Sequence, residues 1–231
     1  MTSDKLSMFV PTAIRAIMAR LAPRIEDAAG VRLAQVIDLN PRIPERISAG
    51  ERFDVALTNP RYVEALVSAG RADGATHRAF GRVPLAVGRK AGTHERILRD
   101  VNEIATLFRT AESIAYTGAG TSGRTYLDAV GRLGLTGEIL PKSHPMPGGE
   151  PVAAVAAGDI GLAIAPLTTV LSTQGVAPAA IFPEELETHI DISVFLSATP
   201  RTGAAQILAF LTAGDLDAEL AAAGVVRFEL S

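Results

Sequence analysis

Residues 112–135 read ESIAYTGAGTSGRTYLDAVGRLGL. An apolar strand near Ser113 is followed by a turn of glycine, threonine and serine, and then by an amphipathic helix. Gly118, Gly120 and Gly123 would allow the backbone to approach a ligand closely. The N–H groups of a first helical turn have no partner inside the helix, and the helix dipole favours negative charge beside them. This stretch therefore predicts an anion-binding turn between a strand and a helix.

The same strand–turn–helix pattern recurs three times in the first third of the chain. Strands are predicted over residues 6–10, 33–37 and 53–57, and helices over 12–28, 41–49 and 61–68. Repeated units of this kind favour a parallel sheet covered by helices. Four such turns together predict a pocket lined by helix N-termini.

The remaining chain continues as an α/β pattern. Strands are predicted over residues 83–88, from 113, over 160–165, 190–197 and 225–228, and helices over 101–109, 121–135, 150–157, 168–172, 202–212 and 216–223. We predict two lobes, each a mainly parallel sheet covered by helices. Residues 1–83 plus 191–231 form lobe one and residues 84–190 form lobe two, with a ligand cleft between them at the carboxyl ends of the strands.

Composition excludes several classes of function. The 231 residues are 48% apolar, which is enough for a substantial core, and the net charge of −3 offers no strong field to a nucleic acid. The absence of cysteine excludes disulfides and cysteine-ligated metals. No apolar run approaches the ~18 residues of a membrane span, so membrane insertion is not expected.

The first residues lead directly into a strand. Met1–Lys5 contain no basic region, apolar stretch and cleavage site of the secretory type. The sequence as written therefore predicts a cytoplasmic protein, and a periplasmic one if a signal peptide had been removed.

Thr121, Ser122 and Gly123 form the best predicted anion cradle, because backbone N–H groups donate to an oxyanion without any cationic side chain. An ordinary helix cap suits the same threonine and serine. Asn40 and Thr12 fit a cap and a ligand contact equally well. Thr58, with Asn59 after it, is more typical of a structural turn, although it is also retained as a candidate ligand contact.

Candidate catalytic groups are less distinctive. The arginines nearest the predicted turns are Arg42, Arg61, Arg82, Arg89 and Arg124. Arg124, in the first turn after the cradle, is the best candidate for clamping a carboxylate. Candidate bases are His77, His144, Lys142, Glu150 and Tyr116. Of these, His144 is favoured because a loop before residues 147–150 would place it over the cleft.

No catalytic or metal-binding motif of known type is present. The sequence has no Ser-His-Asp order, HExxH pair or phosphate-binding P-loop. His94 and His189 have no second histidine nearby in the sequence. We therefore expect no metal and no cofactor.

The chain resembles the extracellular solute-binding family that includes molybdate receptors, which have a type II periplasmic-binding-protein fold. The resemblance rests on FVPTAIRAIMARLAPRIEDAAGVRL, RIPERISAGERFDVALTNPRYVEALVSAGR, AYTGAGTSGRTYLDAVGRLGL and PMPGGEPVAAVAAGDIGLAIAP, in that order along almost the whole chain. It implies that a ligand is held at the turns after four strands. Those positions are Pro11 and Thr12, Asn40, Thr121 and Ser122, and Pro166 and Leu167.

The chain departs from molybdate receptors at these turns. Such receptors place serine or alanine at the first two turns and usually tyrosine at the last, whereas this chain has Thr12, Asn40 and the pair Pro166–Leu167. These differences argue against molybdate itself. The GTSG turn and the PGGEPVAAVAAGD segment are similar to a branch of the family that includes aconitate isomerase.

Two functions follow from the resemblance. The first is an isomerase that closes on an unsaturated di- or tricarboxylate and moves a proton, with His144 as base and Arg124 as clamp. The alternative is a solute-binding receptor of an ABC importer for an organic acid or a molybdate-like oxyanion, with an ABC permease as its partner. A cytoplasmic sensing module is a third possibility, but it would need a partner domain. In each case the expected ligand is a small anion.

Overall fold

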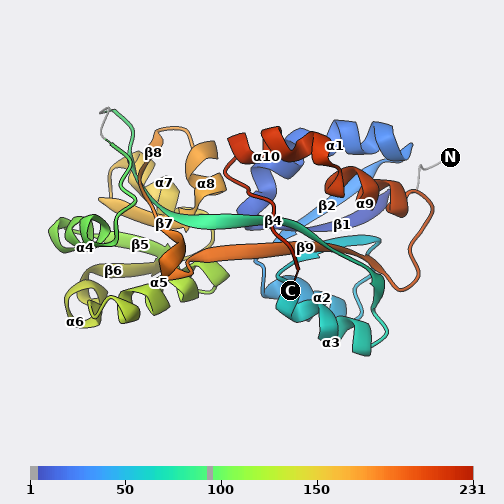
Figure 1. Ribbon diagram of the computed structural model, residues 1–231, viewed down its shortest axis with the longest axis horizontal. Helices are drawn as coiled ribbons and strands as arrows, with labels where there is room; N and C mark the ends of the chain where they lie inside the picture. The colour runs from blue at the N-terminus through green and yellow to red at the C-terminus, as the bar shows by residue number, and fades with distance from the viewer. Residues whose placement is uncertain (1–4, 93–95, 231) are drawn as a thin grey trace. The chain divides into compact units, whose positions relative to one another are not determined.

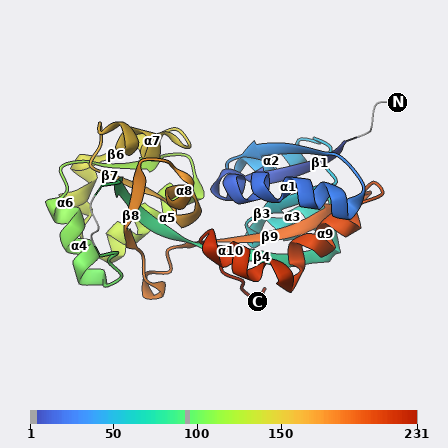
Figure 2. The same cartoon turned by 90° about the horizontal axis from the view of Figure 1, so that it is seen from above.

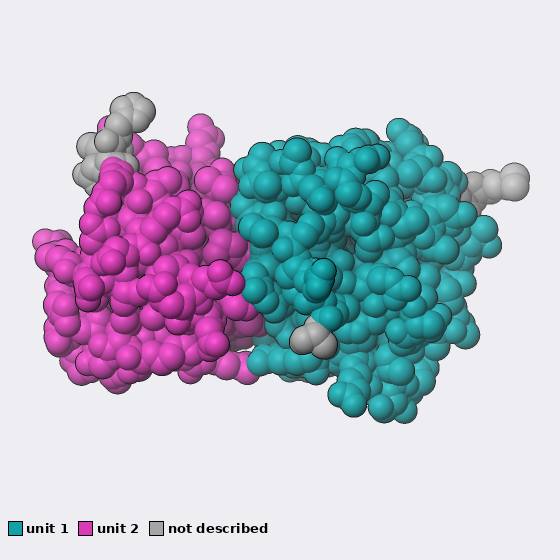
Figure 3. Space-filling view, in the orientation of Figure 1, with its two compact units in different colours: residues 1–82, 191–231 teal, residues 83–190 magenta. Residues whose placement is uncertain are grey.

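The computed structural model describes residues 5–92 and 96–230; His94 lies outside this part of the chain, as does most of the N-terminal segment Met1–Lys5. The chain divides into two compact units. Unit 1 comprises residues 1–82 and 191–231, and unit 2 comprises residues 83–190, as coloured in Figure 3. A ligand cleft between two lobes stays a prediction.

Unit 1 is built on a mixed sheet. Strands β1 (Leu6–Pro11), β2 (Leu33–Asp38) and β3 (Val55–Thr58) are parallel, with β1 in the centre. Strand β9 (His189–Ser197) is antiparallel to β3, and the long strand β4 (Ala72–Lys90) follows β9 in the sheet. Because β1, β2 and β3 run in one direction, their carboxyl ends meet at one edge.

Helices cover both faces of this sheet (Figure 1). Helix α1 (Arg15–Ala29) contacts β1 and β2 and packs beside α9 (Ala204–Thr212), and Figure 2 shows the two side by side. Helices α2 (Arg42–Ser48) and α3 (Val63–Ser68) cover the opposite face. The remaining elements are η1 (Thr12–Ile14), η2 (Pro60–Tyr62), η5 (Gly214–Leu216) and α10 (Asp217–Ala222).

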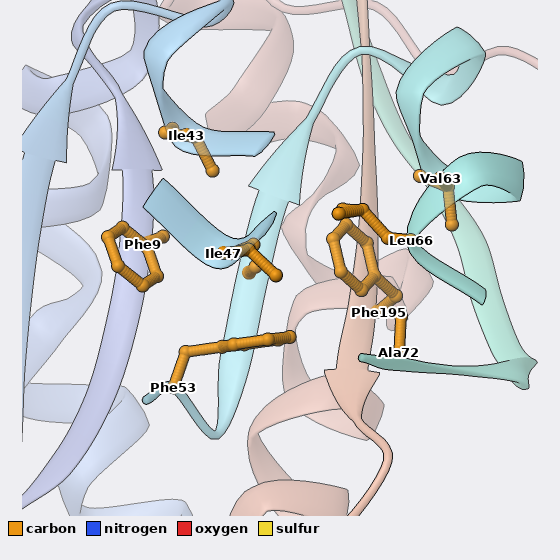
Figure 4. Packing of buried hydrophobic residues seen from close by; sticks show 9 residues of the cluster. Phe9, Ile43, Ile47, Phe53, Val63, Leu66, Ala72 and Phe195 are labelled. Atoms are coloured by element: carbon orange, nitrogen blue, oxygen red, sulfur yellow. The ribbon is translucent and has the colours of Figure 1, made fainter. Parts of the chain in front are cut away.

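The core of unit 1 is aromatic where α2 and α3 meet the sheet (Figure 4). Phe53 packs edge-to-face against Phe9 and Phe195, with ring centroids 6.1 and 5.8 Å away. Ile43 and Ile47 reach this cluster from α2, because they are four residues apart on one helical face. This packing holds the sheet and α2 together, and thereby fixes the turn that connects β2 to α2.

Unit 2 repeats the arrangement. Strand β5 (Ile114–Thr117) lies between β6 (Ser143–Met146) and β7 (Leu162–Pro166), and all three are parallel. Both β7 and β8 (Val176–Ile181) are antiparallel to β4. The helical elements are α4 (Val101–Thr110), α5 (Thr121–Arg132), α6 (Thr136–Ile139), η3 (Leu140–Lys142), α7 (Glu150–Ala157), α8 (Leu167–Ser172) and η4 (Glu184–Leu186). Figure 1 shows α7 above and α5 below β5 and β7.

The α/β fold predicted from the sequence is confirmed, with four differences. The strand predicted at 83–88 is the end of β4, whose polar first half resembles a loop in composition. Strands β6 and β8 were not predicted, because each contains a proline. The helix predicted to reach residue 135 ends at Arg132. The strand predicted at 225–228 is wrong; only Val226 forms a bridge, to Arg82.

None of the helices in the described ranges combines the length and apolar character that crossing a bilayer requires.

Candidate functional site

Asn40 joins two of the predicted turns in unit 1. Its Oδ1 accepts hydrogen bonds from Thr58 Oγ1 at 2.6 Å and from the backbone N–H of Asn59 at 2.9 Å. Thr58 is fully buried and Asn40 is 6% exposed. The two residues follow β2 and end β3, which flank β1, so the side chain of Asn40 spans the carboxyl ends of the sheet. Thr58 therefore orients Asn40.

The amide nitrogen of Asn40 has no hydrogen-bond partner among the described residues, although it is buried. The predicted cap role is wrong, because Asn40 makes no cap bond to α2. A buried donor without an acceptor costs about 1–3 kcal/mol. An anion beside Nδ2 would remove this penalty, so Asn40 is a strong candidate for a ligand contact.

Pro11 and Thr12 lie at the end of the central strand of unit 1. Pro11 is the last residue of β1 and pairs with Asp38. Thr12 begins η1, is half-buried, and η1 has no side-chain cap. The end of β1 therefore brings Thr12 to the same sheet edge as Asn40 and Thr58.

The second candidate turn is the start of α5 in unit 2. The first helical hydrogen bond of α5 runs from the N–H of Arg124 to the carbonyl oxygen of Gly120, at 3.3 Å. The N–H groups of Thr121, Ser122 and Gly123 precede it and have no acceptor within the helix. No side chain caps this N-terminus, so the cap interpretation of the threonine and serine is wrong.

Thr121 supplies a hydroxyl to this turn. Its Oγ1 is buried and has no hydrogen-bond partner within the described ranges, and the adjacent Ser122 is 7% exposed. Both units thus present an unpartnered polar group at a turn that was predicted to hold a ligand. In unit 1 that turn follows β2, the edge strand beside β1, and in unit 2 it follows β5, which lies between β6 and β7.

Gly123 is required by packing. A Cβ atom at this position would lie 2.0 Å from the carbonyl oxygen of Thr117 and 3.0 Å from the ring of Tyr116. Only glycine therefore allows α5 to begin directly against the end of β5. Gly123 thus sets the position of the unpaired N–H groups of this turn, and its own N–H is one of them.

Pro166 and Leu167 end β7 and begin α8, on the strand that neighbours β5. Both residues are buried. Neither side chain can donate a hydrogen bond, so these two side chains would only shape the wall of a site. This differs from Asn40 and Thr121, which carry polar groups.

The environment of His144 differs from the predicted loop. His144 lies within β6, in register with Ala115 of β5, and its side chain is exposed. No hydrogen bond to its ring is found in the described residues. Among the other candidate bases, Lys142 donates to the carbonyl oxygens of Arg109 and Ala111 at 2.7 and 2.8 Å.

The arginines near the turns are mostly engaged elsewhere. Arg42 pairs with Glu45 at 3.0 Å, and Arg61 donates to the hydroxyl of Tyr62 at 2.6 Å. Arg82 forms a two-pronged pair with Asp191, at 2.7 and 3.1 Å. Arg124 is exposed, and its side chain has no partner among the residues described.

The polar groups available at the turns are therefore mainly neutral. They are backbone N–H groups, the hydroxyl groups of Thr121 and Ser122, and the amide of Asn40. Within residues 5–92 and 96–230, no group of three histidine, aspartate or glutamate side chains is placed to hold a metal ion. Sequence reasoning found these turns but missed the Asn40–Thr58 bond. The only signal for that bond is that both polar residues lie at the carboxyl ends of predicted parallel strands, β2 and β3, which flank β1.

The sequence profile of bacterial extracellular solute-binding proteins matches residues 6–225. No match was found among curated proteins.

Solved structures with the same fold cover almost the whole chain. The periplasmic molybdate-binding protein of Azotobacter vinelandii is 16% identical over 96% of this chain and 99% of its own, with a TM-score of 0.79. A substrate-binding domain assigned to a molybdenum ABC transporter of Clostridium difficile is 14% identical over 97% of this chain and 99% of its own, with a TM-score of 0.76. The sulfate-binding protein SubI of Mycobacterium tuberculosis is 15% identical over 96% of this chain and 86% of its own, with a TM-score of 0.71. At these identities the likeness shows the fold alone.

Proposed function

Since the chain belongs to the family of bacterial extracellular solute-binding proteins, we propose that it is a receptor that captures a small oxyanion for an ABC importer. The observation that carries the proposal is the pair of buried, unpartnered groups, Asn40 Nδ2 and Thr121 Oγ1. Each of these groups lies at a turn that follows the carboxyl end of a parallel strand. In a receptor, such groups have no partner within the protein, because the bound ligand is their hydrogen-bond partner.

The donor set favours a compact oxyanion over a polycarboxylate. Backbone N–H groups and hydroxyls can surround a tetrahedral anion without introducing a cation, and they stabilise its charge through oriented dipoles. A tricarboxylate would favour several arginine clamps. Arg42, Arg61 and Arg82 are already engaged, which leaves Arg124 as the candidate clamp without a partner among the described residues. Two of the structural neighbours are named for binding molybdate and sulfate, which are tetrahedral oxyanions. We propose the same class of ligand here.

The comparisons give no support to the isomerase. They also give none to a cytoplasmic location, because the family is extracellular. The exposed position of His144 in a strand removes the geometric reason for choosing it as a base. We propose instead that the protein acts outside the cytoplasm and delivers its ligand to an ABC permease.

The proposal predicts that conservative changes at these turns weaken anion binding. Thr121→Val removes the hydroxyl, and Asn40→Asp keeps the Oδ1 acceptor for Thr58 while replacing the donor with a negative charge. Each variant should lower the affinity for the best of molybdate, sulfate and phosphate about tenfold or more, since hydrogen bonds to charged groups contribute about 1.5–3 kcal/mol. Isothermal titration calorimetry measures the change.

The matched control is Thr125→Val, one turn further along α5, which should leave the affinity unchanged. Thr121→Val should not lower the melting temperature, because the lost hydroxyl has no protein partner. Unchanged affinity in both Thr121→Val and Asn40→Asp would refute the site. Proton exchange from aconitate in heavy water, followed by NMR, would overturn the receptor in favour of an isomerase.

A further inference from the structure

A pocket of about 640 Å³ lies within unit 1, and none of the turns described above lines it. It is lined by Ser7 near the start of β1, Asp54 just before β3, and Ser197 at the end of the antiparallel strand β9. All three positions are at the amino ends of the parallel strands. The pocket is therefore at the sheet edge opposite to Asn40 and Thr58.

An ion pair between buried Asp54 and exposed Arg201 forms one wall of this pocket. Asp54 is 3% exposed, and its carboxylate accepts from Arg201 Nε at 3.0 Å and from Arg201 Nη2 at 2.7 Å. The backbone N–H of Ser7 donates to the same carboxylate at 2.8 Å, and that of Arg201 at 3.2 Å. The negative charge of Asp54 is thus fully engaged, and the wall is held in one geometry by four hydrogen bonds.

Other lining groups have no partner. Ser197 is 7% exposed, and its buried Oγ makes no hydrogen bond with any described residue. Arg52 and Arg71 line the pocket and are exposed, and no hydrogen bond or ion pair to either guanidinium is found in the described chain. The acidic lining residue Glu51 is paired with Arg46 at 2.6 and 2.7 Å.

The charged groups of the pocket that have no ion-pair partner in the described chain are therefore positive, although the net charge of the whole chain is −3. Two free guanidinium groups and a buried hydroxyl form a donor set that suits planar or tetrahedral oxyanions. The volume is in the range of small-molecule sites. A neutral ligand would leave the positive charge of both guanidinium groups without a counter-charge.

We propose that this pocket, formed by Arg52, Arg71, Ser197 and the Asp54–Arg201 pair, is a second binding site for a small multivalent anion that carries phosphate or carboxylate groups. Arg52 and Arg71 bind the charged groups, and Ser197 Oγ donates a hydrogen bond from the wall. The site lies wholly in unit 1, so it does not rest on the function proposed for the turns.

The test titrates the full chain with pyrophosphate and with citrate, as one phosphate and one carboxylate probe. Backbone amide shifts in a ¹⁵N NMR spectrum locate binding: Ala198 and Thr199 report the pocket, and Thr121 and Ser122 report the turn of α5. We expect at least one probe to shift the pocket amides. The double variant Arg52→Gln/Arg71→Gln should weaken that binding about tenfold or more.

The charge-matched control is Lys90→Gln/Arg99→Gln, which removes two exposed cations of unit 2 and should leave the pocket shifts unchanged. Ser197→Ala should weaken binding without lowering the melting temperature, since its hydroxyl has no protein partner. The proposal is overturned if neither probe shifts the pocket amides, or if Arg52→Gln/Arg71→Gln binds as well as the control.

Discussion

Gly123→Ala should destabilise unit 2 by about 3 kcal/mol, at the upper end of the usual range for overpacking. The new Cβ would lie 2.0 Å from the carbonyl oxygen of Thr117, a backbone atom that cannot move without shifting β5. Helix α5 must therefore retreat from the strand, which also displaces the N–H groups of the anion-binding turn. Urea unfolding followed by circular dichroism measures the loss.

Gly131 provides a control in the same helix. A Cβ atom there meets no atom within 4 Å, and the residue is exposed. Gly131→Ala should raise stability by about 0.5 kcal/mol, because alanine loses less backbone entropy in a helix than glycine does. Opposite signs at the two glycines are the expected result. Equal effects would show that helix propensity, and not the close approach to Thr117, determines the outcome at Gly123.

Asp54→Asn should cost about 2 kcal/mol, because the buried carboxylate accepts four hydrogen bonds that an amide can replace only in part. Asparagine offers one acceptor where the carboxylate of Asp54 offers two, so the paired guanidinium of Arg201 loses its two-pronged contact. Asp54 also links the start of β1 to the segment after β9 through Ser7 and Arg201. Its loss should therefore loosen several strands together.

The cost of Asp54→Asn should depend on pH. Burial would raise the pKa of Asp54, but hydrogen bonds from Arg201 and from the N–H of Ser7 outweigh it and hold the pKa below its usual range. Because the pKa is lowered on folding, the stabilisation is present above the ordinary carboxyl pKa of about 3.9 and is lost as the pH falls through the folded value.

Urea unfolding of the wild type and of Asp54→Asn at a series of pH values tests this dependence. The two proteins should differ most near neutral pH and converge in acid. The control is Asp27→Asn on the exposed side of α1, which should change stability by less than about 0.5 kcal/mol at any pH. A difference between Asp54→Asn and the wild type that stays constant down to acid pH would contradict the role given to the ionised carboxylate.

Local patterns in the sequence were sufficient for most of the fold. Helix α7 begins and ends at the predicted residues, because a glycine turn precedes Glu150 and Gly158 adopts the left-handed conformation after it. Gly30 ends α1 in the same way. In contrast, β6 and β8 contain prolines and are stabilised by pairing with β5 and β4, which no local pattern reveals.

The candidate site shows the same limit. The sequence by itself determined that polar turns follow parallel strands and precede helices, since glycine, proline, threonine and asparagine act through local geometry. Only the tertiary structure decided which groups are left without a partner. Whether Asn40 caps a helix or bonds Thr58, and whether Asp54 meets Arg201, depends on residues 18 and 147 positions away, and those are brought together by the packing of whole strands.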